Sequence, residues 1–149
     1  AGRPALAIAP ASLMNGQSVA VVQQVLAWAA PLLKDGPVLV YSTAEPEAVK
    51  AVQAQVGVAQ AGALVEHALA AVACGLVDLG VRQLVVAGGE TSGACVQALG
   101  IAQLQIGPQI DPGVPWCFAP NATGGLHIAL KSGNFGTEDF FSKAFGVLA

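Results

Sequence analysis

One apolar run passes directly into a glycine pair, followed by an acid and two hydroxyl side chains. This segment is Leu84–Gly93, LVVAGGETSG. Glycine lets backbone N–H groups approach a ligand, and a helix start offers unpaired N–H donors and the positive end of the helix dipole. Together these features predict a cradle for an anion such as phosphate. Thr91 and Ser92 add hydroxyl donors, whereas Glu90 would repel phosphate unless it faces a metal, a ribose or a cap position.

The spacing of these glycines matches no general phosphate-binding motif. It fits neither G-x-G-x-x-G nor G-x-x-x-x-G-K-[ST]. Taken alone, the segment therefore leaves an alternative open, in which a structural glycine turn leads into a capped helix.

A second strand-like run ends in a similar turn at Leu130–Gly136, LKSGNFG. The turn contains Gly133. Lys131, two residues before this glycine, either contacts phosphate or is an ordinary surface lysine. Parallel strands bring such turns to the same carboxyl edge of a sheet, where open α/β folds bind their ligands. Two cradles on one edge predict an extended phosphorylated ligand such as a nucleotide.

Other candidate residues are less informative. Ser12 and Asn15 follow the first expected strand and would lie on the same edge, but a turn or an N-cap explains them as well. Neither His67 nor His127 has a neighbouring base or metal partner in sequence, so no catalytic role is assigned. Trp116 lies in a proline-rich segment and either lines the ligand or packs in the core.

The three cysteines, Cys74, Cys95 and Cys117, show no C-x-x-C spacing. This scatter argues against a disulfide framework and against a zinc site. Buried thiols in a reducing compartment are the default, so we expect a cytoplasmic protein and assign no metal ligands.

The apolar patterns alternate between the strand period and the helix period along the chain. This order predicts an α/β fold in which a mostly parallel sheet is covered by helices, as a single three-layer domain over residues 1–149. Proline-rich residues 108–121 are expected to form a loop. The expected strands are 4–9, 37–42, 83–87, 103–106 and 125–131, and the expected helices are 18–33, 45–55, 58–79, 90–99 and 137–145. The strand at 4–9 is expected to be buried.

Composition narrows the class of protein. Of the 149 residues, 54% are hydrophobic and 10% are charged, and the net charge is −3. The chain is too apolar to be disordered and lacks the basic surface of a nucleic-acid binder. No purely apolar run reaches roughly 18 residues, so no membrane-spanning helix is expected. The shortage of charge fits either an alanine-rich composition or a surface covered by a partner.

Three blocks together resemble a known family. VVAGGETSGACVQALG, IGPQIDPGVPW and IALKSGNFG with EDFF following are similar to the C-terminal nucleotide-binding domain of the four-carbon acid sugar kinases. That family includes 3-oxo-tetronate, D-threonate and D-erythronate kinases. The blocks occur in family order and cover residues 84–141, whereas residues 1–83 match more loosely through PASLMNGQSVA.

The resemblance implies ATP binding, with Mg²⁺ as the accompanying ion. The family's nucleotide contacts correspond here to Gly88, Gly89, Glu90, Thr91 and Gly133. The family's early Gly-Ser-Cys-Ser stretch would fall on residues 9–12, where only Ser12 matches.

The resemblance also implies a divided enzyme. The N-terminal domain, which supplies most of the acid-sugar site in the family, is absent from this sequence. We therefore expect a nucleotide-binding domain that acts with a partner domain or as a homo-oligomer and is inactive as a kinase by itself. Two alternatives stay open: a stand-alone nucleotide-binding or regulatory module, and a structural domain that binds no ligand.

Overall fold

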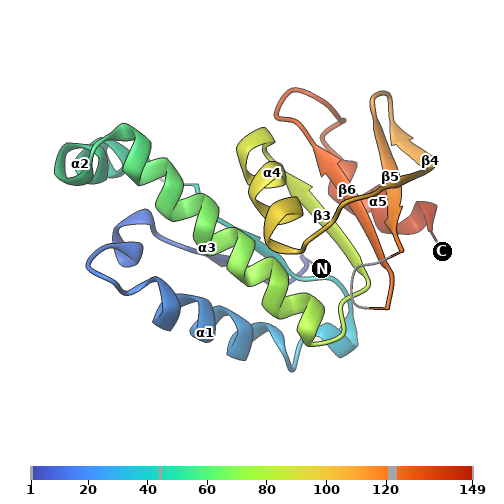
Figure 1. Cartoon of the computed structure of the whole chain (residues 1–149), viewed down its shortest axis with the longest axis horizontal. Coiled ribbons are helices and arrows are strands. Elements are labelled where there is room, and N and C mark those ends of the chain that lie inside the picture. The colour runs from blue at the N-terminus through green and yellow to red at the C-terminus, as the bar shows by residue number, and fades with distance from the viewer. Residues whose placement is uncertain (1, 44, 121–123, 149) are drawn as a thin grey trace. The chain divides into compact units, whose positions relative to one another are not determined.

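A computed structural model describes residues 2–43, 45–120 and 124–148 (Figure 1). The chain divides into two compact units, Ala1–Leu76 and Val77–Ala149. Each unit combines helices with strands, which confirms the predicted α/β class.

The first unit contains a pair of short parallel strands and three helices. The strands β1 and β2 pair with Ala5 opposite Leu39. Ala5 and Ala7 are exposed, so the expectation that the first strand is buried is wrong for β1, although Ile8 just after it is buried. The elements of the unit are β1 (Ala5–Ala7), the 3₁₀ turn η1 (Pro10–Leu13), α1 (Ser18–Ala29), the 3₁₀ turn η2 (Leu33–Asp35), β2 (Leu39–Tyr41), α2 (Pro46–Val56) and α3 (Val58–Asp78).

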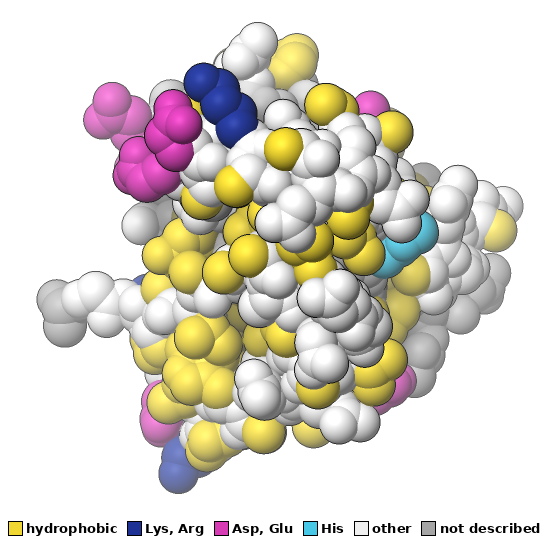
Figure 2. All heavy atoms as spheres, turned by 90° about the vertical axis from the view of Figure 1, so that its left-hand side faces the viewer, with side chains coloured by type: hydrophobic (Ala, Val, Ile, Leu, Met, Phe, Trp, Pro, Cys, Tyr) yellow, Lys and Arg dark blue, Asp and Glu magenta, His cyan; other side chains and the backbone are white. Residues whose placement is uncertain are grey.

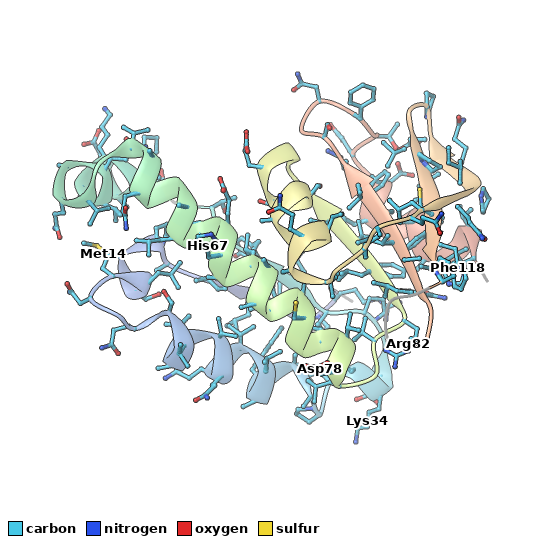
Figure 3. The ribbon with its side chains drawn as sticks, in the orientation of Figure 1. Met14, Lys34, His67, Asp78, Arg82 and Phe118 are labelled. Atoms are coloured by element: carbon cyan, nitrogen blue, oxygen red, sulfur yellow. The ribbon has the colours of Figure 1, made fainter. Side chains whose placement is uncertain are left out.

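Helix α3 packs against α1 through a small residue. A Cβ placed on Gly75 would run into the side chain of Leu26, so glycine permits this close approach. The helix is also long and apolar enough to cross a membrane, a test that core helices pass as well. Ala68 and Val72 are buried, and 39% of the apolar window of the helix is buried in all. Figure 3 shows His67 on the same helix, and its side chain is exposed.

The second unit is built on a four-stranded sheet with the strand order β3-β6-β5-β4. Only β3 and β6 run parallel, while β4–β5 and β5–β6 are antiparallel. The sheet is therefore mixed, and the prediction of a mostly parallel sheet is wrong. The elements are β3 (Gln83–Ala87), α4 (Gly89–Ala98), β4 (Gln105–Asp111), β5 (Val114–Ala119), β6 (Leu126–Lys131) and α5 (Phe140–Val147).

The expected loop at residues 108–121 is instead a hairpin, as far as the structure describes it. Pro108 lies on edge strand β4, where the register shifts, and an edge or bulge tolerates a residue without an N–H. Pro112 and Gly113 form the turn, and β5 then pairs with β6. Pro108 and Pro112 thus lie on the edge of a sheet and in a turn, and Pro115 lies within β5, so this segment is not irregular.

Helices cover both faces of this sheet, so the second unit has three layers (Figure 1). Helix α5 packs on the face that carries Trp116 and Ala129, and α4 packs on β3 and β6. Trp116 is fully buried, and its indole N–H donates to the carbonyl of Ala144 at 2.7 Å. Trp116 is therefore a core residue that holds α5, and it is not positioned to stack on a ligand.

Arg82, in the segment between α3 and β3, makes hydrogen bonds at the end of α3. Figure 3 shows Arg82 between α3 and β3. Its guanidinium donates to the carbonyls of Val77, at 3.0 Å, and Val81, at 2.8 Å. Val77 lies in the last turn of α3, so the Arg82 cation opposes the negative end of the helix dipole there.

Candidate functional site: two glycine turns at one edge of the sheet

The first glycine turn joins β3 to α4 within two residues. Gly88 has φ +110° and ψ +130°, a conformation that L side chains rarely adopt, and α4 begins at Gly89. No side-chain hydrogen bond caps this helix among the described residues. Because the first amides of a helix have no intrahelical acceptor, the N–H groups at the start of α4 are available to a ligand.

The space around this helix start suits an anion. A Cβ added to Gly89 would meet no atom within 4 Å, so the backbone is open to an approaching group. Thr91 is half-buried, and its hydroxyl oxygen would lie 3.3 Å from a Cβ on Gly88, so it faces the turn. Glu90 is exposed in the first helical turn, where an acid is favoured by the helix dipole.

The second glycine turn follows β6. Gly133 is exposed, and its Cβ position is also open. The ammonium of Lys131 donates to the carbonyl of Gly133 at 3.0 Å and lies 3.4 Å from the carbonyl of Ser132. Lys131 therefore places a positive charge on the turn itself.

The chain does not pass directly from this turn into a helix. Helix α5 begins at Phe140, so the prediction of a helix starting at Thr137 is wrong. Residues 132–139 form an exposed loop instead. The second turn can thus offer a ligand loop amides and a lysine, without a helix dipole.

The sheet brings the two turns together. Strands β3 and β6 are parallel, with Ala87 opposite Lys131 at their carboxyl ends. The N–H of Gly88 then donates to the carbonyl of Lys131 at 2.8 Å. The predicted convergence of two turns, more than 40 residues apart in sequence, at one sheet edge is confirmed. Nucleotide binding at that edge stays a prediction.

Ser12 belongs to the first unit and is described apart from these turns. It is exposed in η1, and its hydroxyl donates to the carbonyl of Ala9 at 2.6 Å. Nearby Asn15 has φ +57°, as turn asparagines often do. The local structure fits a turn residue, and the family assignment of Ser12 to the nucleotide stays a prediction.

Sequence reasoning missed a polar cluster beside the second turn. Asp111, at the end of β4, is 5% exposed and forms a salt bridge with Lys143 of α5. Its carboxylate also accepts from the N–H of Thr137, at 2.9 Å, and from the Thr137 hydroxyl, at 3.2 Å. These residues are 26 and 32 positions from Asp111, so no local spacing signalled the cluster.

The cluster keeps its charges. The hydrogen bond from Lys143, followed by that from the Thr137 amide, lowers the pKa of Asp111. The hydrogen bond to Asp111 raises the pKa of Lys143, and the hydrogen bond from the Thr137 hydroxyl lowers the pKa of Asp139. Asp111 and Lys143 are thus held in their ionised forms at neutral pH.

A shallow hollow of about 250 Å³ lies elsewhere on this unit. Its lining includes Ile106, Phe118 and His127, and the rings of Phe118 and His127 stand 4.9 Å apart. His127 lies at the start of β6, whereas the glycine turns lie beyond the ends of β3 and β6. His127 is therefore not placed to act on a ligand held at the turns.

Comparison with known proteins identifies the family. A family model described as the nucleotide-binding C-terminal domain matches residues 1–141. The chain belongs to this family. The finding confirms the resemblance drawn from the three sequence blocks.

Several curated relatives of the chain are called 3-oxo-tetronate kinase. The chain is 59% identical over 151 residues to the 3-oxo-tetronate kinase of Pseudomonas fluorescens, and the match covers 100% of this chain and 34% of the kinase. It is 57% identical over 148 residues to the 3-oxo-tetronate kinase of Burkholderia multivorans, and this match covers 99% of the chain and 34% of that kinase. The chain therefore spans about a third of the length of the curated relatives it matches.

A solved structure shares the fold. A Haemophilus influenzae protein of the DUF1537 family superimposes with a TM-score of 0.86 at 38% identity. The match covers 99% of this chain and 35% of that protein. The fold described above therefore also occurs in a solved protein of the DUF1537 family.

Proposed function

We propose that this chain binds ATP at the two glycine turns and serves as the nucleotide-binding domain of a kinase acting on a four-carbon sugar acid of the 3-oxo-tetronate type. The observation that carries the proposal is the hydrogen bond from Gly88 to Lys131, because it fixes both turns at one edge. The names of the relatives support the acceptor class.

The residues present fit a polyphosphate. The open positions at Gly89 and Gly133 leave room for phosphate oxygens against the backbone. Free amides at the start of α4 would donate to them, and the Thr91 hydroxyl would add one donor. Lys131 would contribute charge from the opposite turn.

Phosphoryl transfer depends mainly on positioning and on neutralising charge along the triphosphate. Mg²⁺ bound with ATP would supply part of that neutralisation. Exposed Glu90 would face the metal or the ribose rather than a phosphate, since two negative groups would repel each other. The role of this chain is then to hold the nucleotide with its γ-phosphate turned toward an acceptor.

The acceptor site belongs to another part of the kinase in this proposal. The chain offers no side chain that we can assign as catalytic base or as sugar-acid contact in the described residues. The remaining two thirds of the relatives' length would supply them. We accordingly expect the isolated chain to bind nucleotide without phosphorylating a sugar acid, in the cytoplasm where ATP is abundant.

Calorimetric titration tests the proposal. ATP and ADP are titrated into the chain with and without Mg²⁺, and saturable binding with one nucleotide per chain is expected. The remainder of a 3-oxo-tetronate kinase, expressed separately, is then added with ATP and a four-carbon sugar acid. Absence of nucleotide binding would contradict the proposal, and so would phosphorylation by the chain alone.

A regulatory nucleotide-binding module is the second candidate. The observation that favours it is the departure at residues 9–12, where three of four family positions differ and the Ser12 hydroxyl is used within its own turn. ATP binding without turnover in the reconstituted mixture would favour this module over the kinase domain.

A further inference from the structure

The loop that carries the second glycine turn has little internal structure. Residues 132–139 are all exposed, and the backbone hydrogen bond between two of its members joins the Phe135 N–H to the Ser132 carbonyl at 3.1 Å. A loop that must aim amides at a ligand has to be fixed, because ordering it at the moment of binding weakens affinity. One side-chain hydrogen bond, from the Thr137 hydroxyl to Asp139 at 2.5 Å, lies within the loop, and Asp111, Lys131 and Lys143 contact the loop from outside.

Asp111 provides the first of these contacts. Its buried carboxylate accepts from the Thr137 N–H, shares the proton of the Thr137 hydroxyl with Asp139, and pairs with Lys143 in α5. Lys143 in turn donates to the Thr137 hydroxyl at 2.7 Å. One carboxylate therefore joins the β4–β5 turn, the loop and the last helix.

The turn of the same hairpin provides the second contact. Gly113 has φ +81°, and a Cβ there would lie 2.8 Å from the ring of Phe135. The Phe135 ring thus rests directly on the glycine backbone. Two residues of the loop, Phe135 and Thr137, are held by the single turn that begins at Asp111.

An ion pair with a buried acid is a weak source of stability, because removing the carboxylate from water offsets most of its attraction to the half-buried Lys143. What such a pair does provide is a defined geometry. Asp111 is placed to give that geometry to a loop whose first residues form the second glycine turn. Without Asp111 the loop would keep its two ends, the Lys131 contact at Gly133 and the Phe135 contact at Gly113, but no contact on Thr137 from β4.

We infer that Asp111, acting through Thr137 and Lys143, is a positioning residue for the nucleotide: it holds the Ser132–Thr137 loop where the second glycine turn can share a polyphosphate with the first. The inference rests on the proposed ATP binding at these turns. Asp111 contacts no nucleotide in this account.

The test measures MgATP affinity of the full chain by calorimetry and loop order by amide hydrogen exchange. Asp111→Asn keeps the size of the side chain and removes its charge, and Thr137→Val removes the hydroxyl. Each is expected to raise the Kd for MgATP at least about tenfold, a loss typical of a broken positioning contact. In Asp111→Asn the Thr137 amide should also exchange at least about tenfold faster with nucleotide absent.

Two matched variants separate positioning from general stability. Thr137→Ser keeps the hydroxyl and should restore MgATP affinity to within about twofold of the original chain. Glu47→Gln removes an exposed ion pair with Lys50 in the first unit and should leave affinity unchanged. A loss of affinity in both Thr137→Val and Thr137→Ser would overturn the inference, because the hydroxyl would then not matter.

The outcomes distinguish this inference from the proposed function. If the unaltered chain fails to bind MgATP, the proposed function fails and the inference fails with it. If the chain binds MgATP and Asp111→Asn binds equally well, only the inference is overturned. If Asp111→Asn does not fold, the comparison of Thr137→Val with Thr137→Ser decides the question by itself.

Discussion

The two glycine turns lie side by side, yet different parts of the fold hold them. The first turn is set by regular secondary structure, since β3 ends at Ala87 and α4 begins at Gly89. The second turn opens an eight-residue loop, 132–139, before α5 begins. Side chains from elsewhere in the sheet fix that loop. The proposed anion site thus combines a rigid helix start with a loop that depends on distant partners.

The difference has consequences for how each turn responds to substitution. Changes at the first turn act directly on the open backbone where a phosphate would lie. Changes at the second turn act through Asp111, Gly113 and Phe135, which are outside the proposed site or at its margin. We therefore expect abrupt loss of binding at the first turn and graded loss at the second.

The largest expected effect is at the first turn. Gly89→Asp should reduce ATP affinity by at least about a hundredfold, because a carboxylate would occupy the cradle and repel the phosphates. Calorimetry measures the affinity, and Gly89→Asn is the matched control because it has the same size without the charge. If Gly89→Asp and the unaltered chain bind ATP with equal affinity, Gly89 is not part of the nucleotide site.

A smaller effect is expected where the hairpin supports the second turn. Gly113→Ala places a Cβ against the Phe135 ring at a residue with positive φ, and the φ alone costs about 1–2 kcal/mol of unfolding free energy. The variant should therefore lose stability in urea and also lose several-fold in ATP affinity. Gly100→Ala is the control, since Gly100 has φ +65° and open space at its Cβ position. It should lose stability without losing affinity, and loss of affinity in both variants would contradict the account.

The second turn should also depend on pH in a defined window. The pKa of Asp111 is lowered from 3.8, so its carboxylate stabilises the loop at pH values above 3.8, and this contribution is lost as pH falls through the lowered value. The pKa of Lys143 is raised from 10.5, so its contribution is lost only above that value. After correction for intrinsic rates, the exchange rate of the Thr137 amide, relative to the rates of amides in α4, should be constant from about pH 5 to 9. In stronger acid the loop amides should become less protected from exchange. A change in the exchange protection of the loop amides near pH 7 would contradict a role for the Asp111–Lys143 ion pair in holding the loop.

The smallest effect is expected inside α4. The Ser92 hydroxyl is buried and has no hydrogen-bond partner among the described residues. Ser92→Ala removes an unsatisfied polar group, so unfolding in urea should show unchanged stability or a gain of up to about 1 kcal/mol. ATP affinity should not change. A loss of more than about 1 kcal/mol would mean that the hydroxyl makes a hydrogen bond in solution.

One of the two explanations for the low charge content is a surface covered by a partner. Exposed apolar side chains in the structure favour this explanation. Figure 2 shows one face on which hydrophobic side chains occupy the middle and charged side chains stand at the margins. Val19 and Val58, both in the first unit, are 69% exposed. Exposed apolar side chains of this kind are typical of surfaces that contact a partner.

Local patterns were sufficient to predict the elements around the first turn. The uncharged run at Gln83–Ala87 and the glycine pair after it correspond to β3 and the start of α4 as observed. The expected helix at 58–79 corresponds to α3 because its apolar period continues without interruption to Gly80. The strand at Leu126–Lys131 was likewise predicted from its alternation.

The second turn could be located from sequence, but its support could not. Proline-rich residues 108–121 concealed a hairpin, because prolines on an edge strand and in a turn look like a loop in sequence. The partnership of Asp111 with Thr137 and Lys143 depends on strand order and on where α5 packs. Neither is encoded in local spacing, so the cluster became visible only in three dimensions.

The most direct test of the central claim follows both turns in one experiment. The chain is labelled with ¹⁵N, titrated with MgATP, and the backbone amide shifts of Gly89–Thr91 and Ser132–Gly133 are recorded. The account predicts that both groups shift together with one common Kd, which Gly89→Asp abolishes in both. Shifts confined to one turn, or two groups with different Kd values, would contradict the claim that the two turns hold a single polyphosphate.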